Sequence, residues 1–258
     1  MTSDDVVLYD VQDGVAYIRL NRPEKLNAIN GTMADTLRET WRRFEADPKV
    51  RVGVLSGSGT SFCAGRDISP GAVDPAIPFQ THHALPENGV QVFKPIVSAV
   101  HGYVLGAGYN LGVRSADITI AADTCLFGYP EGKAGIPVMP IEYTPHLPFK
   151  VSLEFALLGW KGGRLIDSSR AFQLGLANTV VQESEMLHEA LTWAELLLEV
   201  PPLYIRSVKR GHYRAATTQA QLSRREHVDY VWPQEISDDV KEARAAFAER
   251  RAPKFNGK

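Results

Sequence analysis

The chain has 258 residues, of which 44% are hydrophobic and 22% are charged. These values are typical of a globular protein and exclude a collagen, a coiled coil or a disordered chain. The length suits one large domain, or a core with a smaller appendage. Twenty-eight basic residues stand against 30 acidic ones, which gives a net charge of −2. We therefore expect no general nucleic-acid binder, because such a protein carries a basic excess.

The cysteines and the N-terminus bear on the cellular compartment. Cys63 and Cys125 are too few for a disulfide framework or a cysteine-rich zinc site, and we expect both to be small buried hydrophobic residues. The acidic start, residues 1–5, lacks the basic and apolar segments of a signal peptide. We therefore expect a cytoplasmic protein.

The first half of the sequence alternates between short apolar strands and helices. Asp13-Gly14 is a tight-turn dipeptide between two alternating segments, which predicts a β-hairpin. Such alternation favours an α/β core with parallel pairing. The expected elements are the hairpin Val6–Tyr9 and Val15–Leu20, a helix over Thr32–Ala46, strands over Val50–Ser56, Pro95–Val100, Asp117–Ala122 and Thr124–Phe127, and a loop or short helices over residues 69–90.

Residues Ile96–Val113 contain no charged side chain, and this run is close to the minimum length of a membrane span. It also contains four glycines and several polar residues. This composition favours a buried strand, a turn over Gly102–Gly108 and a buried helix that ends near Arg114. We therefore expect no membrane span.

After residue 150 the pattern becomes mainly helical. Asp167 and Ser237 are good N-cap residues, and Gly175 is a typical helix stop. This all-helical part predicts a packing or assembly module beside the α/β core. The expected helices are Ser168–Leu174, Glu185–Glu199, one that starts at Leu203, Gln219–Trp232 and Asp238–Arg250.

The glycine cluster Gly106–Gly112 fits neither common phosphate-binding loop. The dinucleotide pattern requires a glycine where the chain has Leu111, and no Gly-Lys-Ser/Thr follows for a Walker loop. Two interpretations remain. The glycines allow close packing, which is favoured when the cluster is taken alone, or the first N–H groups of the helix bind an anion or a developing oxyanion.

Other side chains that carry chemistry give weaker signals. Glu131 lies in a turn rich in glycine and proline, where a lone glutamate is usually a solvated loop residue. His82 and His83 are adjacent, do not share a helix face and have no carboxylate at i+4, so we expect no metal site. A serine hydrolase is a distant option, because no Gly-x-Ser-x-Gly motif is present.

Several motifs in a fixed order resemble the crotonase (enoyl-CoA hydratase/isomerase) superfamily. The resemblance implies a crotonase-like (ClpP/crotonase) α/β core of repeated ββα units over residues 1–195, and a helical C-terminal oligomerisation module over 196–258. It also implies a homotrimer or a dimer of trimers. The motifs are Asn21–Ala28, Ser61–Asp67, Lys94–Gly102, Gly106–Gly108, Pro130-Glu131, Gly135–Pro137, Ala171–Asn178 and Ala246–Arg251.

The resemblance implies an acyl-CoA thioester substrate, with coenzyme A as part of the substrate and no further cofactor. The amides of Arg66 and Ala107 would bind the thioester oxygen and stabilise an enolate, and Glu131 would be the general acid/base. Typical hydratases of the family have a second glutamate where this chain has Asn110, which we expect to position a water or substrate group. One carboxylate fits double-bond isomerisation. Hydration, decarboxylation, C–C bond hydrolysis of a cyclic or branched acyl-CoA, and a non-catalytic CoA-binding protein remain alternatives.

For coenzyme A, the resemblance implies contacts at both ends of the chain. Arg22 and Lys25 would lie near the phosphates, and the backbone of Ala28 and Ala64 near the adenine base. Phe247 and Arg250 would contribute from the C-terminal helices.

Val138–His146 departs from the glycine-rich turn of many family members. The resemblance implies that this segment lines the acyl side of the pocket, so its change favours an unusual, cyclic or branched acyl group. Glu142 in this segment is a candidate second acid, although a carboxylate at the start of a helix is the more common case.

Overall fold

The computed structural model describes residues 5–74, 76–77, 80–87, 90–136, 147–160, 164–213 and 237–256. The expected helix Gln219–Trp232 and the segment Val138–His146, with Glu142, lie outside these residues. The chain divides into two compact units, of which the first is Met1–Phe127 with Ile166–Arg210 and the second Gly128–Leu165 with Gly211–Lys258. The functional boundary expected at residue 195 stays a prediction.

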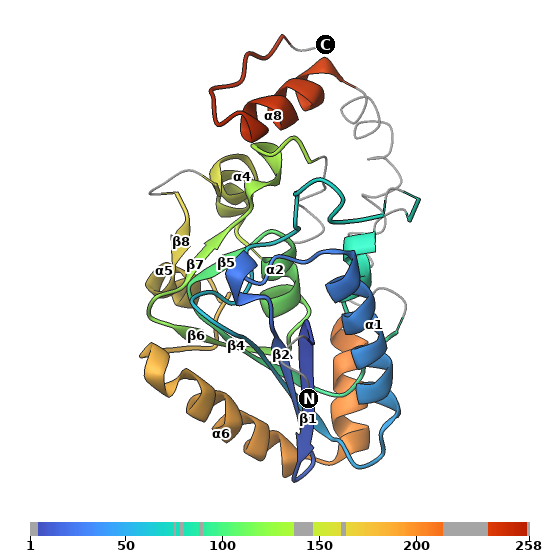
Figure 1. Cartoon of the computed structure of the whole chain (residues 1–258). Helices are drawn as coiled ribbons and strands as arrows, with labels where there is room; N and C mark the ends of the chain where they lie inside the picture. Colours follow the sequence, from blue (N-terminus) through green and yellow to red (C-terminus); the bar gives the residue numbers. More distant parts are fainter. Residues whose placement is uncertain are drawn as a thin grey trace. The chain divides into compact units, whose positions relative to one another are not determined.

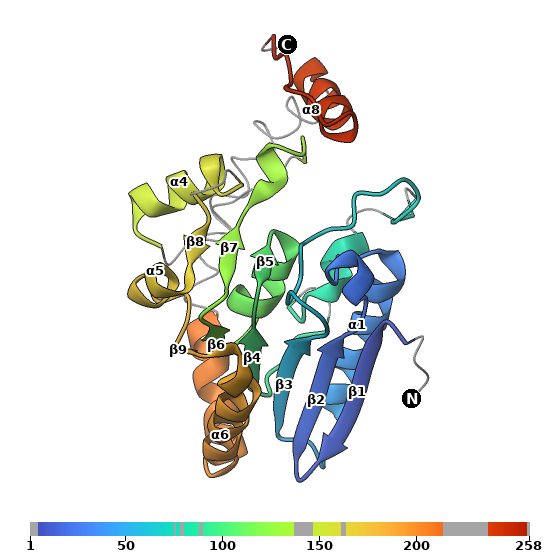
Figure 2. The ribbon, with the colours of Figure 1, turned by 60° about the vertical axis from the view of Figure 1, so that its left-hand side comes forward.

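The first unit is built on a six-stranded sheet. Its strands are β1 (Val7–Gln12), β2 (Val15–Leu20), β3 (Val52–Gly57), β4 (Ile96–Val100), β6 (Ile118–Ala122) and β9 (Thr179–Val181). The order across the sheet is β1-β2-β3-β4-β6-β9. β1 and β2 form the expected antiparallel hairpin, and every other neighbouring pair is parallel (Figure 2). The predicted parallel pairing is therefore confirmed.

Two helices cover opposite faces of this sheet (Figure 1). Helix α1 (Gly31–Ala46) begins where the Asn30 side chain accepts a hydrogen bond from the Met33 N–H. Helix α6 (Met186–Leu198) packs against β3, β4 and β6. Every residue of β4 is buried, as expected for a strand between two helical layers. The apolar residues that we expected on one face of α1 are fully buried: Met33, Leu37, Trp41 and Phe44.

A second sheet alternates with the first along the chain. It contains β5 (Tyr103–Leu105), β7 (Leu126–Gly128) and β8 (Ile166–Asp167) in the order β5-β7-β8. The chain passes from β4 in the large sheet to β5 in the small one, then into helix α2 (Ala107–Tyr109), which continues as a π-helix over Asn110–Arg114. This is one of the repeated ββα units expected from the resemblance.

The interpretation of Gly102–Gly108 as a turn alone is wrong, because it contains β5. The strand has only three residues between two glycines, which is too short for an alternating pattern to show. It also pairs with a distant segment, through a parallel bridge between Cys63 and Val104. The short strands β8 and β9 escaped detection for the same reason.

The remaining helices follow the predicted caps. Asp167 accepts from the Arg170 N–H at 2.8 Å, and Ser237 accepts from the Val240 N–H at 3.2 Å. The last helix ends at Ala248, two residues earlier than expected, because Arg250 has a φ of 55°. These elements are α4 (Phe149–Leu158), α5 (Ser168–Gln173), a helix over residues 202–213, α8 (Asp238–Ala248), and the one-turn helices η1 (Pro23–Lys25), η2 (Gln80–Ala84), η4 (Pro130–Gly132) and η5 (Glu183–Glu185).

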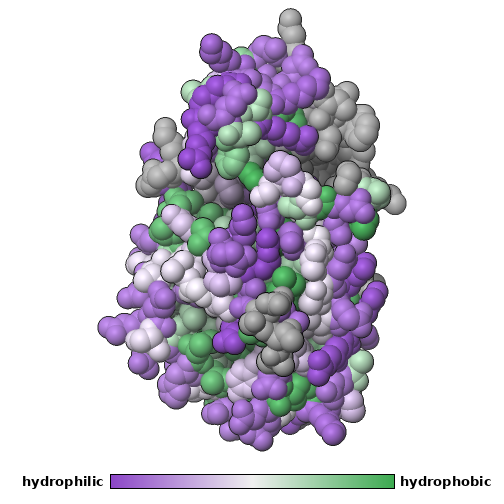
Figure 3. Space-filling view, viewed as in Figure 1, coloured by the Kyte–Doolittle hydropathy of each residue, from purple (hydrophilic) through white to green (hydrophobic). Residues whose placement is uncertain are grey.

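The surface mixes hydrophilic residues with smaller hydrophobic areas on the face that Figure 3 shows. Ile96–Val113, the uncharged run, folds as β4, β5 and the helix that follows. Within the described ranges, no helix combines the length and the apolar character that a membrane crossing needs.

Candidate active site

Two backbone segments run side by side in the first unit and form the framework of the site. The N–H of Cys63 donates to Tyr103 O, and the N–H of Leu105 donates to Cys63 O, both at 3.0 Å. Phe62 donates to His101 O at 2.7 Å. The segment after β3 and the segment that leads into α2 therefore lie in contact along their length.

Glycines make this contact close. A Cβ on Gly108 would lie 2.4 Å from Cys63 O, so no other residue fits there without movement of the backbone. Gly65 has a φ of 99°, and a Cβ on it would lie 2.9 Å from Leu105 O and 3.6 Å from the nitrogen of Ala107. The packing interpretation of the glycine cluster is therefore correct, and this packing brings Arg66 and Ala107 to the same place.

Both of these residues present an unused backbone donor. Ile29 forms a parallel bridge with Arg66, in which the Ile29 N–H donates to Gly65 O at 2.8 Å and the Asp67 N–H donates to Ile29 O at 2.9 Å. The N–H of Arg66 consequently points away from this bridge. Ala107 is the first residue of α2, so its N–H has no partner within the helix. Neither N–H donates to another described residue, and such a pair can bind an oxygen that develops negative charge.

Asn110 follows Ala107 by one helical turn. Its backbone N–H donates to Gly106 O at 3.0 Å, and its side chain is 5% exposed. The side-chain oxygen Oδ1 is buried and has no hydrogen-bond partner among the residues that the structure describes. A buried acceptor of this kind is suited to hold a water or a polar substrate group. The positioning role expected for Asn110 stays a prediction.

Glu131 belongs to the second unit, in the one-turn helix that follows β7. Its side chain is 7% exposed, and Oε2 has no hydrogen-bond partner within the described ranges. Burial raises the pKa of Glu131 from 4.5 to about 8, while a hydrogen bond from its own backbone N–H acts weakly in the opposite direction. The interpretation as a solvated loop residue is therefore wrong. A carboxyl group with a pKa near neutrality can both take up and return a proton.

The backbone groups expected near adenine are partly used inside the protein. The N–H of Ala28 donates to Lys25 O and the N–H of Ala64 donates to Leu26 O, both at 2.9 Å. The carbonyl oxygen of Ala64 accepts no backbone hydrogen bond from the described residues, whereas Ala28 O accepts one from Arg22 Nη1 and has a second lone pair for a base. The side chain of Lys25 is exposed, as a phosphate contact requires.

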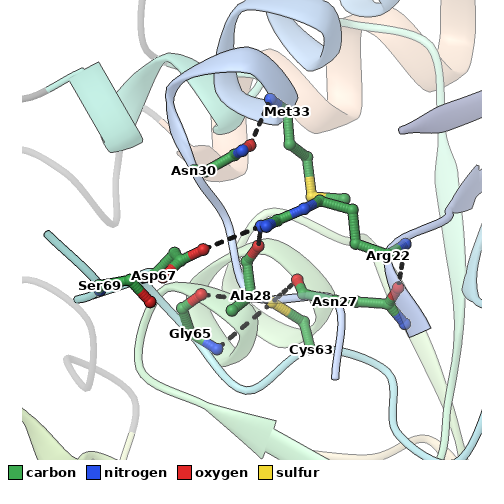
Figure 4. A network of polar contacts seen from close by, with 9 residues as sticks. All are labelled: Arg22, Asn27, Ala28, Asn30, Met33, Cys63, Gly65, Asp67 and Ser69. Atoms are coloured by element: carbon green, nitrogen blue, oxygen red, sulfur yellow. Dashed lines mark hydrogen bonds and ion pairs between the residues drawn. The ribbon is translucent and has the colours of Figure 1, made fainter. Parts of the chain in front are cut away.

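Arg22 is placed differently from a surface phosphate ligand. Its guanidinium is turned into the protein, where Nη1 donates to Asp67 Oδ2 at 3.1 Å and to Ala28 O at 2.5 Å (Figure 4). Sequence reasoning missed this use of Asp67. Its partner lies 45 residues away, and no local pattern marks such a distant pair.

The two C-terminal candidates lie in the second unit. Phe247, on α8, is 42% exposed, and Arg250, just after this helix, is also exposed. Both side chains are thus available for contacts outside their own unit. Their expected contact with coenzyme A stays a prediction.

The two cysteines and His83 have surroundings that bear on their chemistry. Both cysteines are buried, as expected, and burial raises the pKa of each thiol to about 12. The Nδ1 atom of His83 lies 3.1 Å from Asp35 Oδ1. In the described part of the chain, no group of three or more histidine, cysteine or acidic side chains has the arrangement of a metal site.

Known proteins resemble this chain over nearly its whole length. The family model for enoyl-CoA hydratase/isomerase matches residues 10–258. The (E)-benzylidenesuccinyl-CoA hydratase of Thauera aromatica is 31% identical over 261 residues, which cover 97% of this chain and 99% of that protein. The 1,2-epoxyphenylacetyl-CoA isomerase of Escherichia coli is 30% identical over 270 residues, with 98% and 99% covered.

Among solved structures, a carnitinyl-CoA hydratase from Mycobacterium avium matches with a TM-score of 0.82 and 28% identity, over 98% of this chain and 99% of that one. The crotonase fold expected from the resemblance is therefore confirmed. The relatives are named as enzymes, both a hydratase and an isomerase. The protein is an acyl-CoA enzyme, and the chain belongs to the enoyl-CoA hydratase/isomerase family.

Proposed function

We propose that the protein converts an enoyl-CoA by way of a thioester enolate. The N–H groups of Arg66 and Ala107 bind the thioester carbonyl oxygen and stabilise the negative charge that moves onto it. A preorganised donor of this kind contributes about 3–4 kcal/mol to the transition state. Two of them make a proton on the α-carbon of the thioester acidic enough for a carboxylate to remove.

The observation that carries this proposal is the pair of unused N–H groups on two segments that glycine packing holds together. Because these donors are backbone groups, they do not depend on the side chains at positions 66 and 107. This independence fits a family in which relatives act on different acyl groups, as the names of the matched proteins state.

Glu131 is proposed to move the proton. In an isomerisation, its carboxylate removes a proton from one carbon and returns the same proton to another, while the electron pair shifts through the enolate. The raised pKa of about 8 supports both halves of this cycle. Asn110 cannot carry a proton, so a single carboxyl supports isomerisation. Hydration is the second candidate, supported by the 31% identical hydratase.

We propose coenzyme A contacts from Lys25, Phe247 and Arg250, and from the carbonyl oxygens of Ala28 and Ala64. The acyl group is proposed to be cyclic or branched. Two matched relatives are named for acyl groups that contain a phenyl ring, which supports this choice. A screen of straight-chain, branched and aromatic enoyl-, 3-hydroxy- and oxoacyl-CoAs by chromatography coupled to mass spectrometry identifies the substrate, because an isomerised product has the mass of its substrate and is recognised by its retention time. It also separates isomerisation and hydration from C–C bond cleavage and decarboxylation.

We propose a homotrimer or a dimer of trimers that forms through the helical C-terminal part. Leu203 and Tyr204, in the helix over 202–213, are 80% and 63% exposed, and such apolar exposure supports a contact with another copy. Light scattering at micromolar concentration tests this, and a monomeric mass contradicts it. The cytoplasmic location stays a prediction.

The decisive test of the chemistry is the variant Glu131→Gln, which keeps the shape of the side chain and removes its proton transfer. We expect turnover of the identified enoyl-CoA to fall by about 10²–10⁴-fold, the usual contribution of a general acid/base. Turnover that survives within about tenfold contradicts the mechanism. In water labelled with ¹⁸O, isomerisation yields an unlabelled product and hydration a labelled one.

A further inference from the structure

An inward-facing ion pair lies directly beside the proposed oxyanion-binding backbone. Arg22 Nη1 and Asp67 Oδ2 are 3.1 Å apart, and their side chains are only 13% and 8% exposed. Asp67 is the residue that follows Arg66. The carboxylate is therefore attached to the peptide segment that carries one of the two proposed donors.

Asp67 is held at three points. Its backbone N–H donates to Ile29 O at 2.9 Å, and its second carboxylate oxygen, Oδ1, accepts from the Ser69 N–H at 3.0 Å. Burial by itself raises the pKa of this carboxyl, but the hydrogen bonds from Ser69 and Arg22 outweigh it and lower the pKa below its usual value. Asp67 is thus ionised at neutral pH, and a charged acceptor gives the shorter and stronger kind of hydrogen bond to Arg22.

Arg22 is itself linked, through Asn27, to the segment that precedes Arg66 and Asp67. Asn27 Oδ1 accepts from the Arg22 backbone N–H at 2.8 Å (Figure 4). Asn27 Nδ2 donates to Ser58 O and to Ser61 O, both at 2.8 Å. Asn27 is fully buried. The backbone that carries the Arg22 side chain is therefore held, through Asn27, to Ser58 and Ser61.

The thiol of Cys63 completes the network. It donates to Asn27 O at 3.1 Å and accepts from the Gly65 N–H at 3.4 Å. Gly65 and Asp67, the neighbours of Arg66 on either side, are thus both held by side chains of this network. The N–H of Arg66 itself donates to no other residue in the part of the chain that the structure describes. The polar contacts fix the peptide around this donor and leave the donor free.

We propose that Arg22 is a positioning residue, which acts through Asp67 to hold the Arg66 N–H in the direction of the thioester oxygen. This assignment rests on the proposed function, because it presumes that Arg66 donates to substrate. It differs from the phosphate contact expected for Arg22, since the guanidinium acts on the protein and not on coenzyme A. Removal of either partner leaves the other charge buried and unpaired, so both changes should disturb the same peptide.

The first test measures the carbonyl stretch of bound [1-¹³C]butyryl-CoA by infrared difference spectroscopy. Oxyanion-hole donors polarise the carbonyl and move its band to lower frequency. We expect the full displacement in wild type and in Glu131→Gln, and less than half of it in Arg22→Gln and in Asp67→Asn. A full displacement in all four proteins overturns the positioning role. No displacement in wild type contradicts the proposed function itself, so the two failures are distinguishable.

The second test separates positioning from phosphate binding. With the identified substrate, we expect Arg22→Gln and Asp67→Asn each to lower kcat by about 10–100-fold, with KM within about threefold. The double variant should be no slower than the slower single variant, because both act on one peptide. The acyl-pantetheine substrate, which lacks the nucleotide, should show the same losses. Losses that appear in KM, only for the CoA thioester and only in Arg22→Gln, would overturn the proposal.

Two further variants guard against unfolding as the cause. Arg22→Lys keeps the charge with a simpler donor and should recover part of the lost kcat and of the carbonyl displacement. Arg42→Gln removes one member of the exposed Arg42–Glu39 ion pair on α1 and serves as the matched control. It should leave both readouts unchanged. Equal losses in Arg42→Gln would refute a specific role of Arg22.

Discussion

The Glu131→Gln substitution should also change how the free energy of unfolding depends on pH. This prediction does not require the substrate to be known. Burial raises the pKa of the carboxyl from 4.5 to about 8 in the folded protein. Because the folded pKa is the higher one, the stabilising contribution is complete below pH 4.5 and is lost as the pH rises through 8. The difference between the two pKa values corresponds to about 5 kcal/mol at 1.36 kcal/mol per pKa unit. Glutamine does not ionise and does not show this loss.

Urea unfolding of wild type and Glu131→Gln at pH 5 and at pH 9 measures the effect. We expect the variant to gain about 4 kcal/mol relative to wild type between the two pH values. Glu195→Gln, which removes an exposed glutamate from α6, is the control for the loss of one negative charge. If the free-energy gap between wild type and Glu131→Gln is the same at both pH values, the carboxyl is not desolvated and the proton-transfer argument loses its basis.

Two predictions concern the packing that supports the site. Trp41 is fully buried and its Nε1 donates to Ala84 O at 2.7 Å, so Trp41→Phe should cost about 2–4 kcal/mol of unfolding free energy in urea. A loss below about 1 kcal/mol would contradict this bond. Gly65→Ala introduces a Cβ 2.9 Å from Leu105 O and should lower kcat more than tenfold, by displacing the donor beside it. Gly71→Ala has a similar positive φ of 75° but open space around its Cβ, so equal kcat losses in both variants would show backbone strain alone to be responsible.

Local patterns in the sequence were sufficient for the elements whose signals are local. The four apolar residues of α1 recur at helical spacing, and the Asp13-Gly14 turn lies between alternating strands. The three-residue strand β5 was missed because distant pairing, and not its own pattern, makes it a strand. Asn27 shows the same limit, since its left-handed φ of 54° and its bonds to Ser58 and Ser61 depend on a segment more than 30 residues away.

The candidate site residues also depend on distant contacts, which no local sequence pattern shows. The resemblance to a known family was needed to select Arg66, Ala107 and Glu131. For Arg66 and Ala107 the reason is that the functional group is a backbone N–H, which the residue type does not reveal. The burial of Glu131 follows from tertiary packing, and a glutamate between proline and glycine gives no sign of it. The pairing of Arg22 with Asp67 was likewise invisible, since both residues are charged and each alone suggests a solvated surface position.

The net charge of −2 does not conflict with a polyanionic ligand. Charges on the surface are screened beyond about 10 Å at moderate ionic strength, so the total charge has little influence on a bound thioester. Arg22 is paired with Asp67 and adds no free positive charge to this balance. The exposed cations Lys25 and Arg250 are proposed to attract the phosphates, whereas uncharged N–H groups are proposed to stabilise the enolate. A neutral N–H donor binds the oxyanion less tightly than a positively charged side chain would. The negative charge can therefore return to carbon when the proton is delivered.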